Sequence, residues 1–185
     1  MDNGPCNPGL TYDTLLVTMF SDTTAPADAG LDQQICSDVD TAFLAAAATL
    51  PPADGSWSVA SGSGTFSDPN DPNAIVTGMT IGDNQFVWTL DNGPCATYGI
   101  TTDTVTITLF DNNHPAADAG IDQEGCLPAT SVQMAANAYT YPATGYWTLL
   151  SGNANIVDSV NPNTVVDNLV VGFATLLWTI DNGPC

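Results

Sequence analysis

The sequence predicts an all-β chain in which short antiparallel strands form two-layered sandwich domains arranged in tandem. Three observations carry this expectation: a unit of 90 residues occurs twice, apolar and polar residues alternate in short segments, and turn-forming residues separate these segments. No segment keeps apolar residues at helical spacing, because the alanine run 45–48 is short and is followed by Pro51 and Pro52.

The repeat is read from the segment Trp88 to Cys95, which returns with one conservative change as Trp178 to Cys185. Its last five residues also occur near the start of the chain, at Asp2 to Cys6. An offset of 90 residues aligns further large or special residues without a gap from Asp13 onward. These aligned pairs are Phe20 and Phe110, Cys36 and Cys126, and Trp57 and Trp147.

The strands of one repeat follow from alternation and from the turns between them. The clearest is 103–110, where Val105, Ile107 and Leu109 alternate with threonines, and the same pattern occurs at 13–20. Asn, Asp, Gly and Pro residues separate the others and favour turns. The expected strands of the complete repeat are 28–35, 41–47, 56–60, 74–77, 84–90 and 103–110.

The core is expected to hold the alternate residues of these strands, with the repeated tryptophans as anchors. One face of 84–90 carries Phe86, Trp88 and Leu90, which should all be buried. The other residues assigned to the core are Ala42, Leu44, Ala46, Trp57 and Val59, with Val132, Met134, Ala136, Trp147, Leu149 and Trp178 in the second copy.

About seven short strands per repeat describe an antiparallel β-sandwich of immunoglobulin-like type. Residues 1–22 then hold the last strand of a preceding repeat, residues 24–111 form one complete repeat, and residues 115–185 form a second repeat that lacks its last strand. An orphan last strand and an unfilled groove suggest that 13–20 of one copy completes the second repeat of another. A longer continuous array predicts the same geometry without exchange between chains.

The chain has no Lys or Arg and a formal charge of −20, so no carboxylate can pair with a basic side chain. Each must be satisfied by water, backbone N–H groups or metal ions. Nucleic acid is excluded as a partner, because phosphate binding needs basic residues. No run of about 18 to 20 apolar residues is present, so membrane insertion is not expected.

Calcium is the one cofactor that the acidic residues suggest. Asp28, Asp32, Asp118 and Asp122 recur beside glycines at the start of each repeat, where they could bind Ca²⁺ between domains. The alternative is a solvated acidic surface with turn-forming aspartates, and no EF-hand spacing favours the metal.

Five cysteines at repeat-equivalent places indicate disulfides and an oxidising, extracellular setting. One pairing is local, Cys36 with Cys95 and Cys126 with Cys185, which leaves Cys6 to a partner upstream. In an immunoglobulin-like topology, however, the turns that carry a local pair lie at opposite poles, too far apart for a Cα spacing of roughly 6 Å. The other pairing, Cys36 with Cys185, would join consecutive repeats into a stiff rod. Both pairings stay open at this point.

Catalysis is not expected. The single histidine, His114, stands in a linker beside Pro115, where an exposed spacer role is expected, and no nucleophile–base set or phosphate loop appears. A carbohydrate-binding module is the alternative function, since sugars stack on exposed aromatic rings. Its candidate residues are Tyr139, Tyr141 and Tyr146, present only in the second copy.

Three motifs also carry a family resemblance. At Ala27 to Gln33, Ser61 to Asn70 and Trp88 to Cys95 the chain resembles PKD-like and Ig-like tandem repeats of large Bacteroidota surface proteins. These include gliding-motility adhesins and other cargo of the type IX secretion system. The resemblance implies a secreted structural repeat of a cell-surface adhesin or extracellular filament that acts as a stiff stalk. Its partners would be neighbouring repeats or filament subunits, with surface glycans as further candidates.

The same resemblance implies O-glycosylation at Asp-Ser/Thr motifs that precede a small or aliphatic residue or Thr. The acceptor hydroxyls would be those of Thr14, Thr23, Thr41, Thr104 and Ser159. The alternative is that these residues are ordinary hydroxyls at strand edges.

Overall fold

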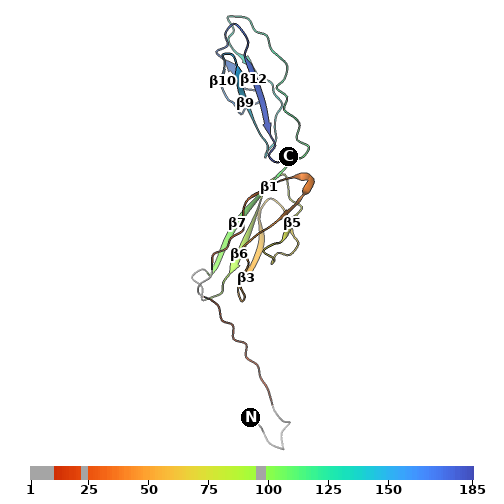
Figure 1. Ribbon diagram of the computed structural model, residues 1–185, viewed down its shortest axis with the longest axis vertical. Helices are drawn as coiled ribbons and strands as arrows, with labels where there is room; N and C mark the ends of the chain where they lie inside the picture. Colours follow the sequence, from red (N-terminus) through yellow and green to blue (C-terminus); the bar gives the residue numbers. More distant parts are fainter. Residues whose placement is uncertain (1–10, 22–24, 95–98) are drawn as a thin grey trace, which may run out of the picture.

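The computed structural model describes residues 11–21, 25–94 and 99–185 as two groups of strands that follow one another along the long axis of the molecule (Figure 1). The first group, called the first repeat, comprises β1 (Gln33–Cys36), the 3-10 turn η1 (Ser37–Val39), β2 (Thr41–Phe43), β3 (Asp54–Ser61), β4 (Thr65–Phe66), β5 (Ile75–Thr77), β6 (Gly82–Asp91) and β7 (Ile100–Phe110). The second repeat comprises β8 (Val132–Gln133), β9 (Thr144–Ser151), β10 (Asn155–Ile156), β11 (Val165–Asp167) and β12 (Thr175–Asp181).

The first repeat is a sandwich of two sheets, in the orders β1-β7-β6-β3 and β2-β5-β4. All pairs are antiparallel except β1 with β7, which is parallel and joins Gln33 to Ile107 and Cys36 to Phe110. The expected immunoglobulin-like β-sandwich is therefore confirmed. The expected first strand, 28–35, is shorter than predicted, because only Gln33–Cys36 form a strand. This strand pairs in parallel with the last strand, β7.

The tryptophans form the centre of the first core, as predicted. Trp57 and Trp88 face each other across β3 and β6 with ring centroids 5.0 Å apart, and both are buried. Ala42, Leu44 and Ala46 are buried as well. The prediction for Val59 is wrong: it lies on the edge strand β3 beside a register shift and is 42 % exposed.

The second repeat keeps the same strands but lacks two of them. β9 begins 90 residues after β3 and pairs with β12, the counterpart of β6, again with Trp147 opposite Trp178. Residues 123–126, the counterpart of β1, form no strand, because β1 is held in its sheet by β7 alone and no counterpart of β7 is present among the described residues. The second buried cluster accordingly holds only Ala136, Trp147 and Trp178, with Met134 partly buried against it.

Residues 13–20, which the sequence predicts to be a strand by analogy with β7, are extended but unpaired in the structure, as are residues 11 and 12. They run out from the end of the first repeat that lies opposite the second repeat (Figure 1). Their apolar side chains are exposed to solvent except that of Phe20, which is half-buried. The strand pattern is thus present without the sheet that would use it, since a strand needs a neighbour for its hydrogen bonds.

Aspartate carboxylates act mainly as acceptors for backbone N–H groups in place of the absent basic side chains. Asp40 accepts from Gly78 and Met79, and Asp103 accepts from Ala29. Others cap turns by accepting from the residue two positions ahead, as predicted for an Asp-rich chain. These turns begin at Asp28, Asp68, Asp71, Asp91, Asp111, Asp118, Asp158 and Asp181.

Asn84 is the polar residue that holds a corner of the first core, and its replacement tests the fold. Its Oδ1 accepts from the backbone N–H groups of Ser63 and Thr80, and it is fully buried. We expect Asn84→Ala to lower the free energy of unfolding by about 2–4 kcal/mol, because two N–H groups lose their acceptor. Asn70→Ala, at an exposed turn, is the control and should change it by about 0.5 kcal/mol or less in urea unfolding. Equal losses in both variants would contradict this role.

Candidate functional site

The functional candidate is the junction, which we define as the contact of β1, β6, β7 and the linker 111–116 with the turn 181–185 and the segment 137–141. A disulfide joins Cys36 to Cys185 across it, with the Cα atoms 5.6 Å apart and 149 positions apart in sequence. Of the two pairings left open by the sequence, this is the one between repeats. Cys126 is free and exposed, and Cys6 and Cys95 lie outside the described residues.

An aromatic ring fills the centre of the junction. Phe110, the last residue of β7, is only 6 % exposed and lies against the backbone of Gly183. A Cβ at Gly183 would stand 2.6 Å from Cζ of Phe110, and its φ of +56° also favours glycine. The Gly of the repeated Asp-Asn-Gly-Pro-Cys motif is therefore required for close contact between repeats.

Hydrogen bonds fix the linker to the second repeat. Asn182 donates from Nδ2 to the carbonyl of Asp111 at 2.8 Å, and Asn137 donates from Nδ2 to Ala116 at 2.9 Å. His114 accepts the backbone N–H of Thr140 at Nε2, 3.2 Å away, so its other ring nitrogen, Nδ1, carries the proton and donates to Pro115. His114 is half-buried here and is not the exposed spacer that the sequence suggested.

Tyr141 links the second repeat to the start of β6 in the first repeat. Its hydroxyl donates to Oδ2 of Asp83 at 2.5 Å, while Oδ1 of Asp83 accepts from the Thr108 hydroxyl at 2.7 Å. These two hydrogen bonds, that from Tyr141 being the larger effect, lower the pKa of Asp83 from its ordinary value, and the same contact raises the pKa of Tyr141. No sequence pattern indicated this pair, since Tyr141 has Pro51 as its counterpart in the first repeat.

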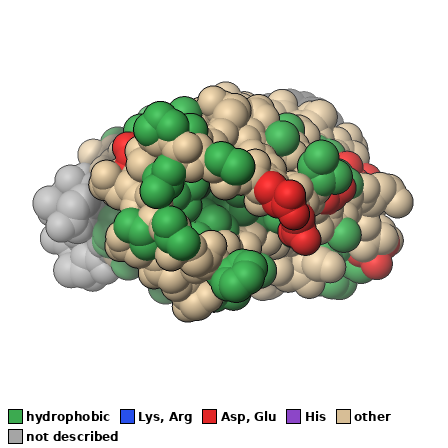
Figure 2. Space-filling model, turned by 90° about the horizontal axis from the view of Figure 1, so that it is seen from above, with side chains coloured by type: hydrophobic (Ala, Val, Ile, Leu, Met, Phe, Trp, Pro, Cys, Tyr) green, Lys and Arg blue, Asp and Glu red, His purple; other side chains and the backbone are tan. Residues whose placement is uncertain are grey.

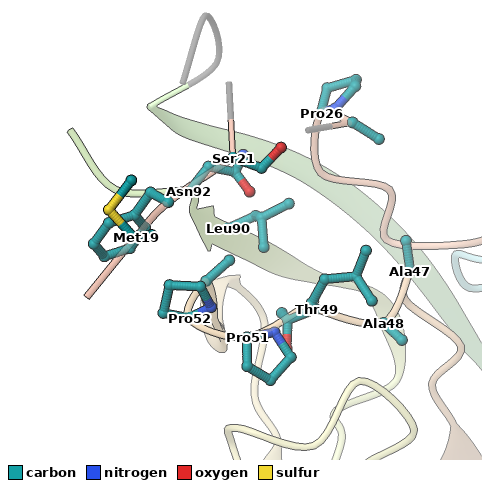
Figure 3. A pocket seen from close by; sticks show the side chains of 14 residues that line it. Met19, Ser21, Pro26, Ala47, Ala48, Thr49, Pro51, Pro52, Leu90 and Asn92 are labelled. Carbon is teal, nitrogen blue, oxygen red and sulfur yellow. The ribbon is translucent and has the colours of Figure 1, made fainter. Parts of the chain in front are cut away.

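The opposite pole of the first repeat has the same contact between a phenylalanine and a glycine, but in the described part of the single chain no neighbouring sandwich packs on it (Figure 1). Phe20, the counterpart of Phe110, lies against Gly93. Beside it is an open hollow lined by Met19, Leu90, Pro51 and Pro52, with Asn92 at its edge (Figure 3). In the second repeat, Tyr139 and Tyr141 stand at the positions of Thr49 and Pro51 that line this hollow. The hollow therefore corresponds to the surface that receives the neighbouring repeat at the junction.

The aspartates proposed as calcium ligands cap backbone N–H groups. Asp28 and Asp118 accept from Gly30 and Gly120, and Asp32 accepts from Thr106. In the part of the chain that the structure describes, no three His, Cys, Asp or Glu side chains gather in a way that could hold a metal ion. The role of these residues and of Asp122 as calcium ligands stays a prediction from the sequence.

The aromatic residues proposed to bind a sugar differ in their exposure. All four tryptophans are buried. Of the three tyrosine candidates, Tyr139 packs at 6.1 Å from the ring of Trp178. Tyr141 is exposed and donates its hydroxyl to Asp83, and Tyr146 on β9 is exposed as well. The glycosylation candidates Thr14, Thr104 and Ser159 are exposed and Thr41 is half-buried, whereas Thr23 lies outside the described residues.

No known protein family and no curated protein matches the sequence. Among solved structures, the chain is similar to the PKD domain of the KIAA 1837 protein, with 21 % identity and a TM-score of 0.42 over 52 % of this chain and 96 % of that one. It is also similar to immunoglobulin domains 1–4 of Sidekick-1, with 12 % identity and a TM-score of 0.43 over 85 % of this chain and 48 % of that one.

A further similarity is to the eight N-terminal Ig domains of the Down Syndrome Cell Adhesion Molecule, with 9 % identity and a TM-score of 0.34 over 83 % of this chain and 26 % of that one. The sandwich is defined by its strand order, β1-β7-β6-β3 facing β2-β5-β4. Sandwich repeats of this type are typical of non-catalytic structural or binding modules, and a disulfide between them is typical of extracellular proteins. No helix in the described part of the chain is long and apolar enough to cross a bilayer.

Removing the disulfide tests the junction energetically. We expect Cys36→Ser with Cys185→Ser to lower the total free energy of unfolding by about 5 kcal/mol, the loop-entropy value for a separation of 149 residues. Cys126→Ser, which removes an exposed free thiol, is the matched control and should have almost no effect. Urea unfolding measures both, and an undiminished stability of the double variant would show that the bridge does not constrain the chain.

The Tyr141–Asp83 contact predicts a pH window. The pKa of Asp83 is lowered, so its contribution is present above its ordinary pKa of 3.8 and is lost as the pH falls through the lower folded-state value. The pKa of Tyr141 is raised, so its contribution is present below 10.0 and is lost as the pH rises through the folded-state value. The stability difference between wild type and Tyr141→Phe should thus be constant between these limits and shrink beyond them. Tyr146→Phe should show no such window.

Proposed function

We propose that the chain is a structural repeat module of a secreted bacterial cell-surface adhesin or extracellular filament, in which it acts as a stiff stalk. The observation that carries the proposal is the junction, where the Cys36–Cys185 disulfide and the Phe110–Gly183 contact hold consecutive repeats end to end.

Several independent contacts across the junction favour stiffness. Domains joined by a linker alone move relative to each other by default. Here the disulfide lies at the end of β1, the Tyr141–Asp83 hydrogen bond lies at the start of β6, and Phe110 lies at the end of β7. Contacts at three separate elements restrict bending as well as twisting about the linker.

The composition suits a module exposed outside the cell. A net charge of −20 keeps the chain soluble and disfavours lateral aggregation of its strands. With no Lys or Arg, the chain offers no cleavage site to proteases that cut after basic residues. Both properties support a long-lived extracellular spacer.

Small-angle X-ray scattering tests the stalk role. We expect the scattering of the wild-type chain, extrapolated to zero concentration, to be that of one rod of fixed length, because the two repeats cannot reorient. The triple variant Cys36→Ser, Cys185→Ser and Gly183→Ala should give a broader distribution of distances, since it lacks the bridge and places a Cβ against Phe110. The matched control is Cys126→Ser with Gly125→Ala, where a Cβ meets nothing within 4 Å.

The scattering outcome is decisive in both directions. Identical curves for the triple variant and its control would show that the junction contacts do not set the angle between repeats. A wild-type chain that already samples many angles would contradict the stalk proposal itself.

A further inference from the structure

The outer edge of β12 is an unpaired sheet edge with a built-in acceptor pattern. Its counterpart β6 carries β7 on this edge, through a continuous register from Gly82 opposite Leu109 to Asp91 opposite Ile100. β12 pairs with β9 on its other side, and among the described residues no strand covers its outer edge. Such an edge presents unpaired N–H and C=O groups to any strand of matching pattern.

Residues 11–20 have the pattern of the missing strand. In the 90-residue register, Leu15, Val17 and Met19 take the places of three β7 residues that are buried in the first core. Those residues are Val105, Ile107 and Leu109. In the single chain Leu15 and Val17 are 88 % and 67 % exposed, so no sheet of the described residues covers these apolar side chains.

The polar groups that position β7 recur 90 residues apart in the 11–20 segment and the second repeat. Asp103 Oδ2 accepts from Ala29 N–H, and Thr101 Oγ1 accepts from Ala27 N–H, each at 2.8 Å. Thr11 and Asp13 supply the same two acceptors, and Ala117 and Ala119 supply the two donors.

In a third contact β7 supplies the donor and the segment before β1 supplies the acceptor. Asp32 Oδ1 accepts the N–H of Thr106 at 2.8 Å. Asp122 and Leu16 are the counterparts in the register. The second repeat therefore holds acceptors and donors suited to this strand in addition to an open edge.

Residues 11–20 of one copy cannot reach β12 of the same copy (Figure 1). Residues 11–20 leave the first repeat at the pole opposite the second repeat, so the length of the first repeat separates them from β12 (Figure 1). We propose that residues 11–20 of a second copy of this chain pair with the outer edge of β12 and complete the second repeat. Since every copy then offers one donor and one acceptor, the chains assemble head to tail into an open filament.

The two poles that would meet are complementary at one further position. Within the chain, Asp83 meets Tyr141. Between copies, the register places Phe173 at the position of Asp83 and Pro51 at the position of Tyr141. The polar pair is replaced on both sides by an apolar pair, and Phe173 is now 94 % exposed. Pro51 lines the hollow of Figure 3, at the first-repeat end of the molecule. At the opposite end, the surface of the second repeat carries groups of hydrophobic side chains (Figure 2).

Analytical ultracentrifugation of the full chain tests this assembly with a matched pair of variants. Val17→Asp places a charge where the buried Ile107 stands in the register, and Leu16→Asp places the same charge at the outward position of Thr106. Both residues are exposed in the single chain, so neither change should alter its thermal unfolding. We expect wild type and Leu16→Asp to form oligomers whose mass rises by whole chains with concentration, and Val17→Asp to stay monomeric.

A synthetic peptide of residues 11–20 gives the second measurement. It should bind the chain and shorten the oligomers, whereas the same peptide with Val17→Asp should do neither. A wild-type chain that is monomeric at all concentrations, or equal loss of oligomers in both variants, would overturn the proposal. So would peptide binding without oligomers, because the edge would then accept such a strand from a source other than a second copy.

The proposal deepens the filament role and can fail separately from it. The scattering experiment concerns the angle between two repeats of one chain, whereas the mass measurement concerns contact between chains. Denaturing gels without reductant distinguish strand pairing from disulfide exchange through the free thiol of Cys126.

Discussion

The last strand of a repeat is the constraint on which the structure depends. β7 pairs with β6 along its length, holds β1 in the sheet, and buries Val105, Ile107 and Leu109 in the core. It then ends in Phe110, which packs on the next repeat, and its parallel pairing brings Cys36 beside Phe110. One strand thus completes a sandwich and positions both the aromatic contact and the disulfide of the junction. In the second repeat, where no counterpart of β7 is present among the described residues, the counterpart of β1 is unpaired and the core is smaller.

The absence of basic residues shapes the rest of the chain. A carboxylate without a cation is costly unless it is solvated or accepts hydrogen bonds. Here aspartates meet that condition by capping turns, and Asp103 goes further by tying the segment before β1 to β7. The charge that keeps the surface soluble also provides the local order of the loops, so the many Asp-x-Asn and Asp-x-Gly turns are structural features.

The sequence predicted those parts of the structure that depend on one repeat. Alternation identified β7 and β6, and the recurrence of Trp57 and Trp88 at inward positions identified the core. It left the disulfide open between two pairings, and the structure has the one between repeats, Cys36 with Cys185.

What the sequence missed lies between repeats. The Tyr141–Asp83 and His114–Thr140 hydrogen bonds join residues whose approach depends on how one sandwich stands on the next. Neither pair has a motif or a counterpart in the other repeat. The 28–35 strand was also misjudged, because its parallel pairing with β7 is a non-local contact that local alternation cannot indicate.

The most direct test of the account is the disulfide map of the unreduced protein. Cleavage before aspartate places the cysteines in different fragments, with Cys36 in 32–37, Cys185 in 181–185, and Cys126 and Cys95 elsewhere. The account predicts a linked pair of fragments 32–37 and 181–185 in the mass spectrum. A link from 32–37 to the fragment with Cys95, or from 181–185 to the fragment with Cys126, would contradict it, since each repeat would then be closed on itself and the junction would lose its covalent bond.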